Sequence, residues 1–116
     1  MASPFAFSDA TKNQARLRQG GRCAACGDDL TDKYEHAHHV VPKQTGKATA
    51  DLWLSSVHNC VILCEDCHTA YHGHGNFATV VAPPSVFKFS HGNNRSAHLQ
   101  WLSRVNERFM SMGGQR

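Results

Sequence analysis

The sequence contains no long hydrophobic run and little excess of charge of one sign. No stretch approaches the ~18 consecutive apolar residues of a membrane helix, and the opening residues, MASPFAFSDATK, lack the basic and apolar segments of a secretory signal. Twelve Lys and Arg against nine Asp and Glu leave a net charge of +3, which permits a polyanionic partner without requiring one. These absences predict a soluble chain with no membrane segment, although export as the cargo of a larger protein remains open.

Internal repeats and low-complexity segments are also absent, and the five cysteines are an odd number. With 116 residues the chain is expected to form one domain, 1–116, with one core, and a core of this size gains from a structural metal. Four of the cysteines form two C-x-x-C pairs. This arrangement fits metal-bound thiolates better than disulfides and indicates a reducing compartment such as a cytoplasm.

Periodicity and turn residues predict a small α+β fold in which two strands of a hairpin are flanked by helices. Ser8 or Asp9 can cap the first helix, and Gly20-Gly21 can end it. Apolar residues recur at spacings of three and four in the last helix, which predicts an amphipathic helix; they are Leu99, Leu102, Val105, Phe109 and Met112. The expected elements are a helix over 9–19, strands over 35–41 and 60–63, a helix over 68–73 and a helix over about 95–112, with a loop over 43–56 and irregular backbone over 76–94.

Four of the cysteines are spaced to bind one structural zinc ion. Each C-x-x-C turn supplies two thiolates with little backbone strain, and Gly27 can take the positive φ that the first turn needs. The two turns give the tetrahedral ligand set Cys23, Cys26, Cys64 and Cys67, with the second turn leading into a helix as in a treble clef. Four thiolates leave no open coordination position, so substrate chemistry must lie elsewhere. Cys60 is left over in an apolar strand and is expected to be a small core residue.

Histidines and one asparagine are concentrated around the second half of this framework. His38 and His39 stand near the end of the first strand, Asn59 at the start of the second, and His68 and His72 on the following helix. Residues four apart on a helix share a face, whereas neighbours on a strand point to opposite sides. One residue of the His38–His39 pair can therefore join the helix histidines around a metal ion, while its neighbour stands beside the metal as a base.

The order C-x-x-C, HHVVP, N-C-V-I-L-C-x-x-C-H-x-x-x-H closely resembles the HNH endonucleases, including colicin-type and polymorphic toxin nucleases, over about residues 20–75. The resemblance implies a ββα-metal core, treble-clef-like around the zinc, that hydrolyses phosphodiester bonds with one divalent ion. For the catalytic ion it implies Mg²⁺, Mn²⁺ or Ni²⁺, with Zn²⁺ as an alternative. Histidine ligands favour the softer ions on affinity grounds.

The resemblance also implies a role for each residue of the motif. His38 and His68 bind the catalytic metal, and His39 is the general base that activates water. Asn59 matches the asparagine of the family name and orients the chain beside His39, and His72 is a further ligand or a contact to the scissile phosphate. A histidine with the reference pKa of about 6.5 accepts a proton near neutral pH and fails in acid. The expected products are a 5′-phosphate and a 3′-hydroxyl.

The other histidines have no assigned role, and a surface or hydrogen-bonded position is the favoured interpretation; they are His36, His58, His74, His91 and His98. Of these, His36 and His74 are close enough to the motif to serve as backup ligands or phosphate contacts. The candidates for contacts to substrate phosphates are Arg22, Lys43, Lys47 and Arg95, with Arg16, Arg18, Arg104 and Arg108 as further basic residues. Most of these residues fit a solvated surface equally well.

No recognition helix is evident, so double-stranded DNA cut with little sequence preference is the expected substrate. The flanking segments resemble toxin-type HNH domains of larger secreted proteins such as type VI secretion effectors. This implies action in the cytoplasm of a target bacterium and a cognate acidic immunity protein. The alternatives are a phage or restriction-associated HNH nuclease, and a non-catalytic zinc-stabilised module that binds nucleic acid or protein. A thiol redox protein would leave the histidines without a use.

Overall fold

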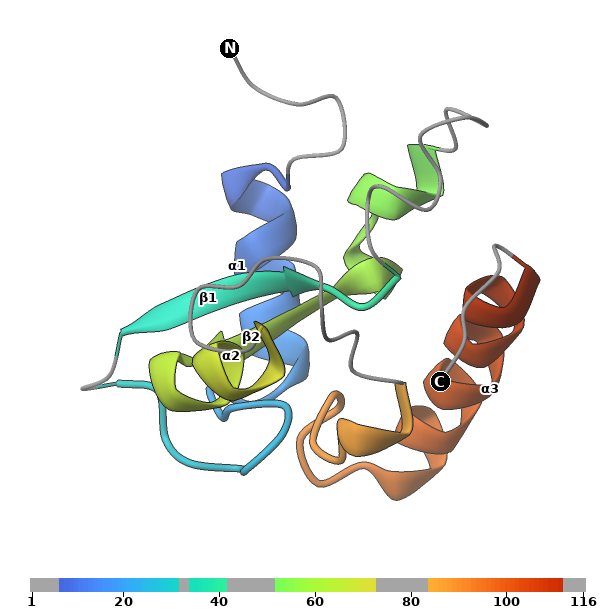
Figure 1. Cartoon of the computed structure of the whole chain (residues 1–116). Helices are drawn as coiled ribbons and strands as arrows, with labels where there is room; N and C mark the ends of the chain where they lie inside the picture. Colours follow the sequence, from blue (N-terminus) through green and yellow to red (C-terminus); the bar gives the residue numbers. More distant parts are fainter. Residues whose placement is uncertain (1–6, 32–33, 42–51, 73–83, 112–116) are drawn as a thin grey trace, which may run out of the picture.

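The computed structural model describes residues 7–31, 34–41, 52–72 and 84–111, except for the side chains of Leu52, Leu54, Tyr71 and His72. The fold is α+β, as the sequence predicts, and Figure 1 shows its arrangement. The elements in chain order are α1 (Asp9–Arg18), β1 (Glu35–His39), the 3-10 turns η1 (Leu52–Ser55) and η2 (Val57–Asn59), β2 (Cys60–Cys64), α2 (Glu65–His72), the 3-10 turn η3 (Pro84–Val86) and α3 (Arg95–Ser111).

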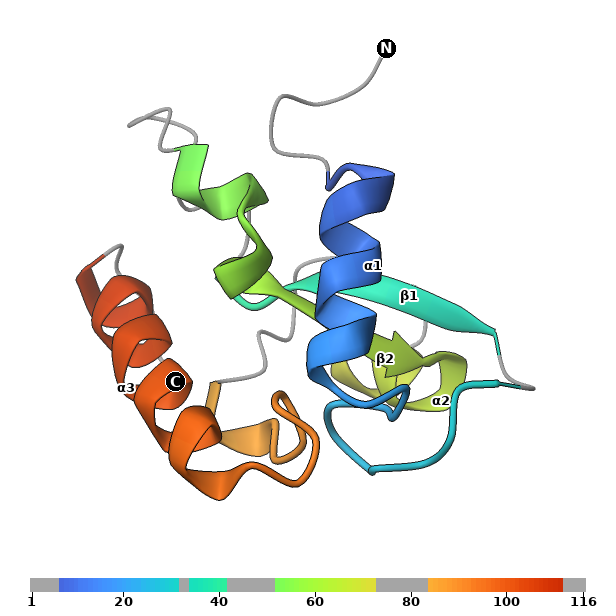
Figure 2. The same cartoon turned by 180° about the vertical axis from the view of Figure 1, so that it is seen from behind.

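The centre of the fold is an antiparallel hairpin of β1 and β2, in which Glu35 pairs with Cys64 and His39 pairs with Cys60. Figures 1 and 2 show α1 and α2 on opposite faces of this hairpin. Every residue of β2 is buried, because this strand is covered on both sides. The alternation of side chains along β1 therefore sends neighbouring residues toward different helices.

Helix α1 begins and ends where the sequence predicts. The Ser8 hydroxyl accepts a hydrogen bond from the amide of Thr11 (3.1 Å), which satisfies one of the unpaired donors of the first turn. Gly20, with φ of 67°, follows the last turn and takes a backbone conformation that other residues rarely adopt. The chain then turns back along β2 and into the first C-x-x-C pair.

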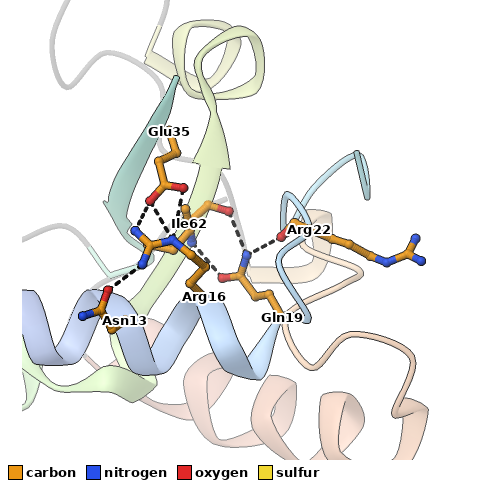
Figure 3. Close-up of polar contacts among 6 residues, drawn as sticks. All are labelled: Asn13, Arg16, Gln19, Arg22, Glu35 and Ile62. Carbon is orange, nitrogen blue, oxygen red and sulfur yellow. Dashed lines mark hydrogen bonds and ion pairs between the residues drawn. The ribbon is translucent and has the colours of Figure 1, made fainter. Parts of the chain in front are cut away.

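The side chains of Arg16 in α1 and of Gln19, which caps the end of α1, hold the helix against the hairpin (Figure 3). Arg16 forms a two-pronged ion pair with Glu35 of β1. Gln19 is fully buried: its Oε1 accepts from the amide of Ile62 (2.8 Å), and its Nε2 donates to the carbonyls of Ile62 (3.0 Å) and Arg22 (2.6 Å). The side-chain amide of Gln19 thus forms hydrogen bonds with the backbone N–H and carbonyl of Ile62, on the edge of β2 that does not pair with β1.

Helix α3 buries most of the expected apolar stripe, with Trp101 in place of Leu99. Trp101, Val105 and Phe109, spaced four apart, face the core, whereas Leu99 is 48% exposed. The helix face is set by Trp101, whose indole N–H donates to the carbonyl of His58 (2.8 Å) and so ties the helix to η2. Leu102 is half-buried as expected, and Met112 lies outside the described residues.

The other element boundaries differ modestly from expectation. Helix α2 begins at Glu65 rather than after Cys67, because Glu65 and Asp66 place negative charge in the first turn, where the helix dipole favours it. Strand β1 ends at His39, although the amide of Val40 still donates to the carbonyl of Asn59 (3.0 Å). The turns η1 and η2 occupy the end of the stretch expected to be loop and the residues up to Asn59. Among the described residues, no helix is both long and apolar enough to cross a membrane.

Candidate functional site

Four cysteines from three parts of the fold converge beneath the hairpin. Cys23 and Cys26 lie in the turn after α1, Cys64 ends β2, and Cys67 is in the first turn of α2. Their sulfur atoms all lie within 4.8 Å of one another, and the Cys26 and Cys64 Sγ atoms are 3.9 Å apart. All five cysteines are free thiols. The four expected ligands are therefore positioned to hold a metal ion, while Cys60 is a buried core residue, as predicted.

The chemistry of this donor set fits a tightly bound soft cation. Burial raises the pKa of Cys26 to about 11 and also raises the pKa of Cys67. Burial raises the pKa of Cys23 as well, but hydrogen bonds from backbone amides, including that of Cys64 (3.5 Å), lower it overall. Because the raised pKa values of Cys26 and Cys67 disfavour their thiolates, a bound cation is needed to hold these two side chains in the ionised form, and Zn²⁺ prefers a tetrahedral sulfur set.

The first cysteine turn has little room for other residues. Gly27 has a φ of 81°, as the sequence predicts, and its amide donates to the carbonyl of Cys23 (2.9 Å). A Cβ atom at this position would come within 2.9 Å of the Phe89 ring, which packs over the turn. The positive φ and the aromatic cover together require glycine here.

Two of the expected metal ligands face each other between β1 and α2. His38 is buried in β1, and His68 is half-buried on α2; their ring centroids are 5.9 Å apart, with the rings nearly perpendicular at 79°. Phe87, a fully buried residue, packs against the same His38 ring at 5.7 Å. This spacing allows the two imidazoles to approach one ion from different sides, since metal–nitrogen bonds to histidine are about 2 Å long.

A third histidine joins this face of the hairpin. His36 is two residues before His38 and so projects to the same side of β1. Its ring stacks on His68 with centroids 4.6 Å apart, and its Nε2 lies 3.7 Å from a carboxylate oxygen of Glu65. Sequence reasoning gave His36 only a backup role, although the two-residue spacing from His38 already predicts that both face α2.

The neighbouring residue, His39, faces the other way. Its ring stacks on Phe7 with centroids 4.0 Å apart and an angle of 18° between the rings. Asn59, fully buried before β2, accepts from the amide of Val41 through Oδ1 (2.7 Å) and donates to the Val41 carbonyl through Nδ2 (3.1 Å). Asn59 thereby fixes the backbone two residues beyond His39.

The remaining expected site residues are placed as follows. His72 ends α2, but its side chain, like Lys43, Lys47 and His74, lies outside the described part of the chain. Arg22 and Arg95 are exposed, and Figure 3 shows the Arg22 side chain pointing away from the Arg16–Glu35 pair. Within the described residues, the four cysteines are the only cluster of three or more side chains able to hold a metal ion together.

Arg18, one of the basic residues considered for phosphate contacts, is engaged within the fold. Its guanidinium donates to the carbonyls of Ser90 (2.8 Å), Val57 (2.7 Å) and Cys60 (2.6 Å), and burial lowers its pKa to about 10. Arg16 is likewise engaged with Glu35. Both residues join α1 to the rest of the fold, and hydrogen bonds to backbone carbonyls far along the chain leave no signal in the sequence.

Comparison with protein families agrees with this arrangement. The family described as HNH endonuclease matches residues 23–74, which include the four cysteines, His38, His39, Asn59 and His68. The predicted resemblance over about 20–75 is thereby confirmed. Comparison with curated proteins found no match.

Proposed function

We propose that the chain hydrolyses nucleic-acid phosphodiester bonds with the help of a divalent metal ion, because residues 23–74 match the HNH endonuclease family. The observation that carries this proposal is the pair of histidine rings, His38 and His68, that face each other across the β1–α2 interface. The pair lies within the family match but belongs to a different ligand set from the four cysteines. Two metal sites with separate tasks follow: a closed structural site and an open catalytic one.

The donor chemistry of the second site suits a catalytic ion. His38 and His68 would hold the ion, with His72 as a further ligand, and two or three protein ligands leave positions for water and phosphate oxygens. When bound, the ion supplies Lewis-acid stabilisation of the charge that develops on the phosphate and the leaving oxygen. Mg²⁺, Mn²⁺ and Ni²⁺ are the proposed ions.

His39 is the proposed general base. Phe7 stacked against its ring and Asn59 bound to the nearby backbone restrict the orientation of the imidazole, which a proton acceptor needs. A neutral imidazole takes the proton from the attacking water. Proton transfer of this kind contributes typically about 10²–10⁴-fold to a rate.

The finer assignment of substrate and role follows from the resemblance. We propose double-stranded DNA, cut with little sequence preference, and an antibacterial effector function restrained by an acidic immunity protein. A phage or restriction-associated nuclease would use the same residues in the same way. Killing of a bacterium that expresses the chain in its cytoplasm, relieved by a gene adjacent to its own, would separate the effector role from these alternatives.

The nuclease proposal is tested by nicking of supercoiled plasmid with Mg²⁺, Mn²⁺, Ni²⁺ or Zn²⁺ added separately to zinc-loaded protein. His39→Ala is expected to lower the cleavage rate by about 10²–10⁴-fold at unchanged zinc content. His98→Asn is the matched control, because His98 lies on α3, outside the family match. Equal cleavage by the His39→Ala protein would remove His39 from the mechanism. If the folded wild-type protein cleaves plasmid with none of these metals, the binding-module alternative is favoured.

A further inference from the structure

A surface pocket of about 530 Å³ lies between α3 and the turns η1 and η2. Figures 1 and 2 both show η1 and η2 on the same side of the hairpin as α3. The side chains that matter most for its chemistry are those of Trp53, His58, Trp101, Arg104, Glu107 and Arg108. None of these is among the residues proposed for catalysis, so the pocket is a separate feature; it is called the tryptophan pocket below.

Specific contacts fix the two walls of the tryptophan pocket. The Trp101 indole N–H donates to the carbonyl of His58, which fixes one wall to η2. The Arg108 guanidinium lies over the ring of half-buried Trp53, 5.0 Å from its centroid, which fixes the opposite wall to α3. Both contacts bridge segments about fifty residues apart in the sequence, and the family match ends before α3 begins.

The combination of groups matches a nucleotide. Aromatic faces stack on bases of any sequence, and guanidinium groups bind phosphate through paired N–H donors. Arg104 and Arg108 lie one turn apart on α3, so their charges reach the same opening of the pocket. Glu107 opposes part of this charge, and the volume is within the range of about 300–1,000 Å³ typical of small-ligand sites.

We propose that the tryptophan pocket binds one unstacked nucleotide of a single-stranded segment of nucleic acid, with the phosphate on Arg104 and the base against the stacked pair of Trp53 and Arg108. The pocket adjoins the proposed catalytic residues through η2: His58 lines the pocket, and the next residue, Asn59, holds the backbone beside His39. A nucleic-acid strand bound in this pocket would be held outside the proposed catalytic site. That consequence rests on the proposed nuclease function, whereas binding itself does not.

The chain provides its own reporter for this pocket, because both of its two tryptophans line it. A short single-stranded oligothymidylate, added at low salt without divalent metal, is expected to change the tryptophan fluorescence saturably. Anisotropy of a fluorescein-labelled oligothymidylate gives the affinity independently. Trp53→Leu and Arg104→Gln should each weaken binding about tenfold, and Arg104→Gln should also lower the salt-dependence slope by about 0.7.

Lys88→Gln is the matched control, because it removes one exposed positive charge elsewhere on the surface and should leave the affinity unchanged within twofold. Thermal melting checks that each variant is folded. Equal weakening by Lys88→Gln would overturn the proposal, since general charge would then explain binding. Equal binding of inorganic phosphate, or of polyglutamate, would overturn it too, because a base would contribute nothing.

The outcomes keep this proposal separate from the nuclease proposal. Binding that survives His39→Ala but not Trp53→Leu supports the pocket even if the protein cuts no plasmid. Plasmid cleavage by wild-type protein, combined with unchanged oligothymidylate affinity in Trp53→Leu and Arg104→Gln, would overturn the pocket and leave the nuclease proposal standing.

Discussion

At the scale of single residues, one hydroxyl joins two histidines at the start of α3 and just before it. Ser90 Oγ lies 3.0 Å from Nδ1 of His91 and 2.7 Å from Nδ1 of His98, and Ser90 is fully buried. Burial, with the charge of Arg18 nearby, lowers the pKa of His91 to about 4, and burial also lowers the pKa of His98. The folded protein therefore favours both rings in the neutral form.

The protein should lose stability in mild acid through His91. The unfolded chain binds a proton at this residue below about pH 6.5, whereas the folded chain does so only below about pH 4. The stabilising contribution is complete above about pH 6.5 and is lost as the pH falls toward 4. Because the His91 ring is partly exposed, we expect the free energy of unfolding to fall by about 1 kcal/mol between pH 7 and pH 5.

Urea denaturation of zinc-saturated protein at both pH values measures this loss. His91→Asn should show a smaller fall in the free energy of unfolding than the wild type, because the titrating group is gone. Zinc release also destabilises the protein in acid, so bound zinc is measured at each pH. An identical pH dependence in the two proteins would contradict the assignment to His91.

Also at the residue scale, the sequence and the structure agree best where local chemistry decides. Ser8 and Gly20 bound α1 because capping depends on near neighbours, and the cysteine pairs reveal the metal site because their spacing is that of the ligand turns. Three other features depend on contacts across the fold. They are the burial of Trp101 in place of Leu99, the hydrogen bonds of Arg18 to distant carbonyls, and the position of His36 beside His68. Only the last of these leaves a readable pattern, the two-residue spacing in β1.

At the scale of elements, α1 depends on Gln19 for its attachment to β2. Replacing Gln19 by leucine removes three hydrogen bonds and leaves the buried amide of Ile62 without this acceptor. We expect the free energy of unfolding to fall by about 3 kcal/mol. Gln14→Leu, the same substitution at an exposed position of α1, should change it by less than about 0.5 kcal/mol. Similar losses in both variants would show that leucine itself disturbs the helix and that the Gln19 contacts stabilise little.

At the scale of the whole molecule, the four-cysteine site links the turn after α1, the end of β2 and the start of α2. In a core this small, metal binding and folding should be one process. Removing zinc with a strong chelator is expected to unfold the chain cooperatively, and Cys26→Ser should bind less than one zinc per chain. Cys60→Ala is the control, because Cys60 is buried outside the cluster and the variant should retain one zinc. A native circular dichroism spectrum after complete zinc removal would contradict this coupling.

The proposed metal ligands His38 and His68 face each other between β1 and α2, whereas the cysteine site links α2 to the end of β2 and to the turn after α1. This separation of tasks is the central claim, and His68 tests it most directly. The measurement is plasmid nicking as Mn²⁺ is added to wild-type and His68→Ala proteins that each contain one zinc per chain. We predict that His68→Ala keeps its zinc and its fold but nicks plasmid at least about 100-fold more slowly than the wild type. Cleavage by His68→Ala at the wild-type rate would contradict it.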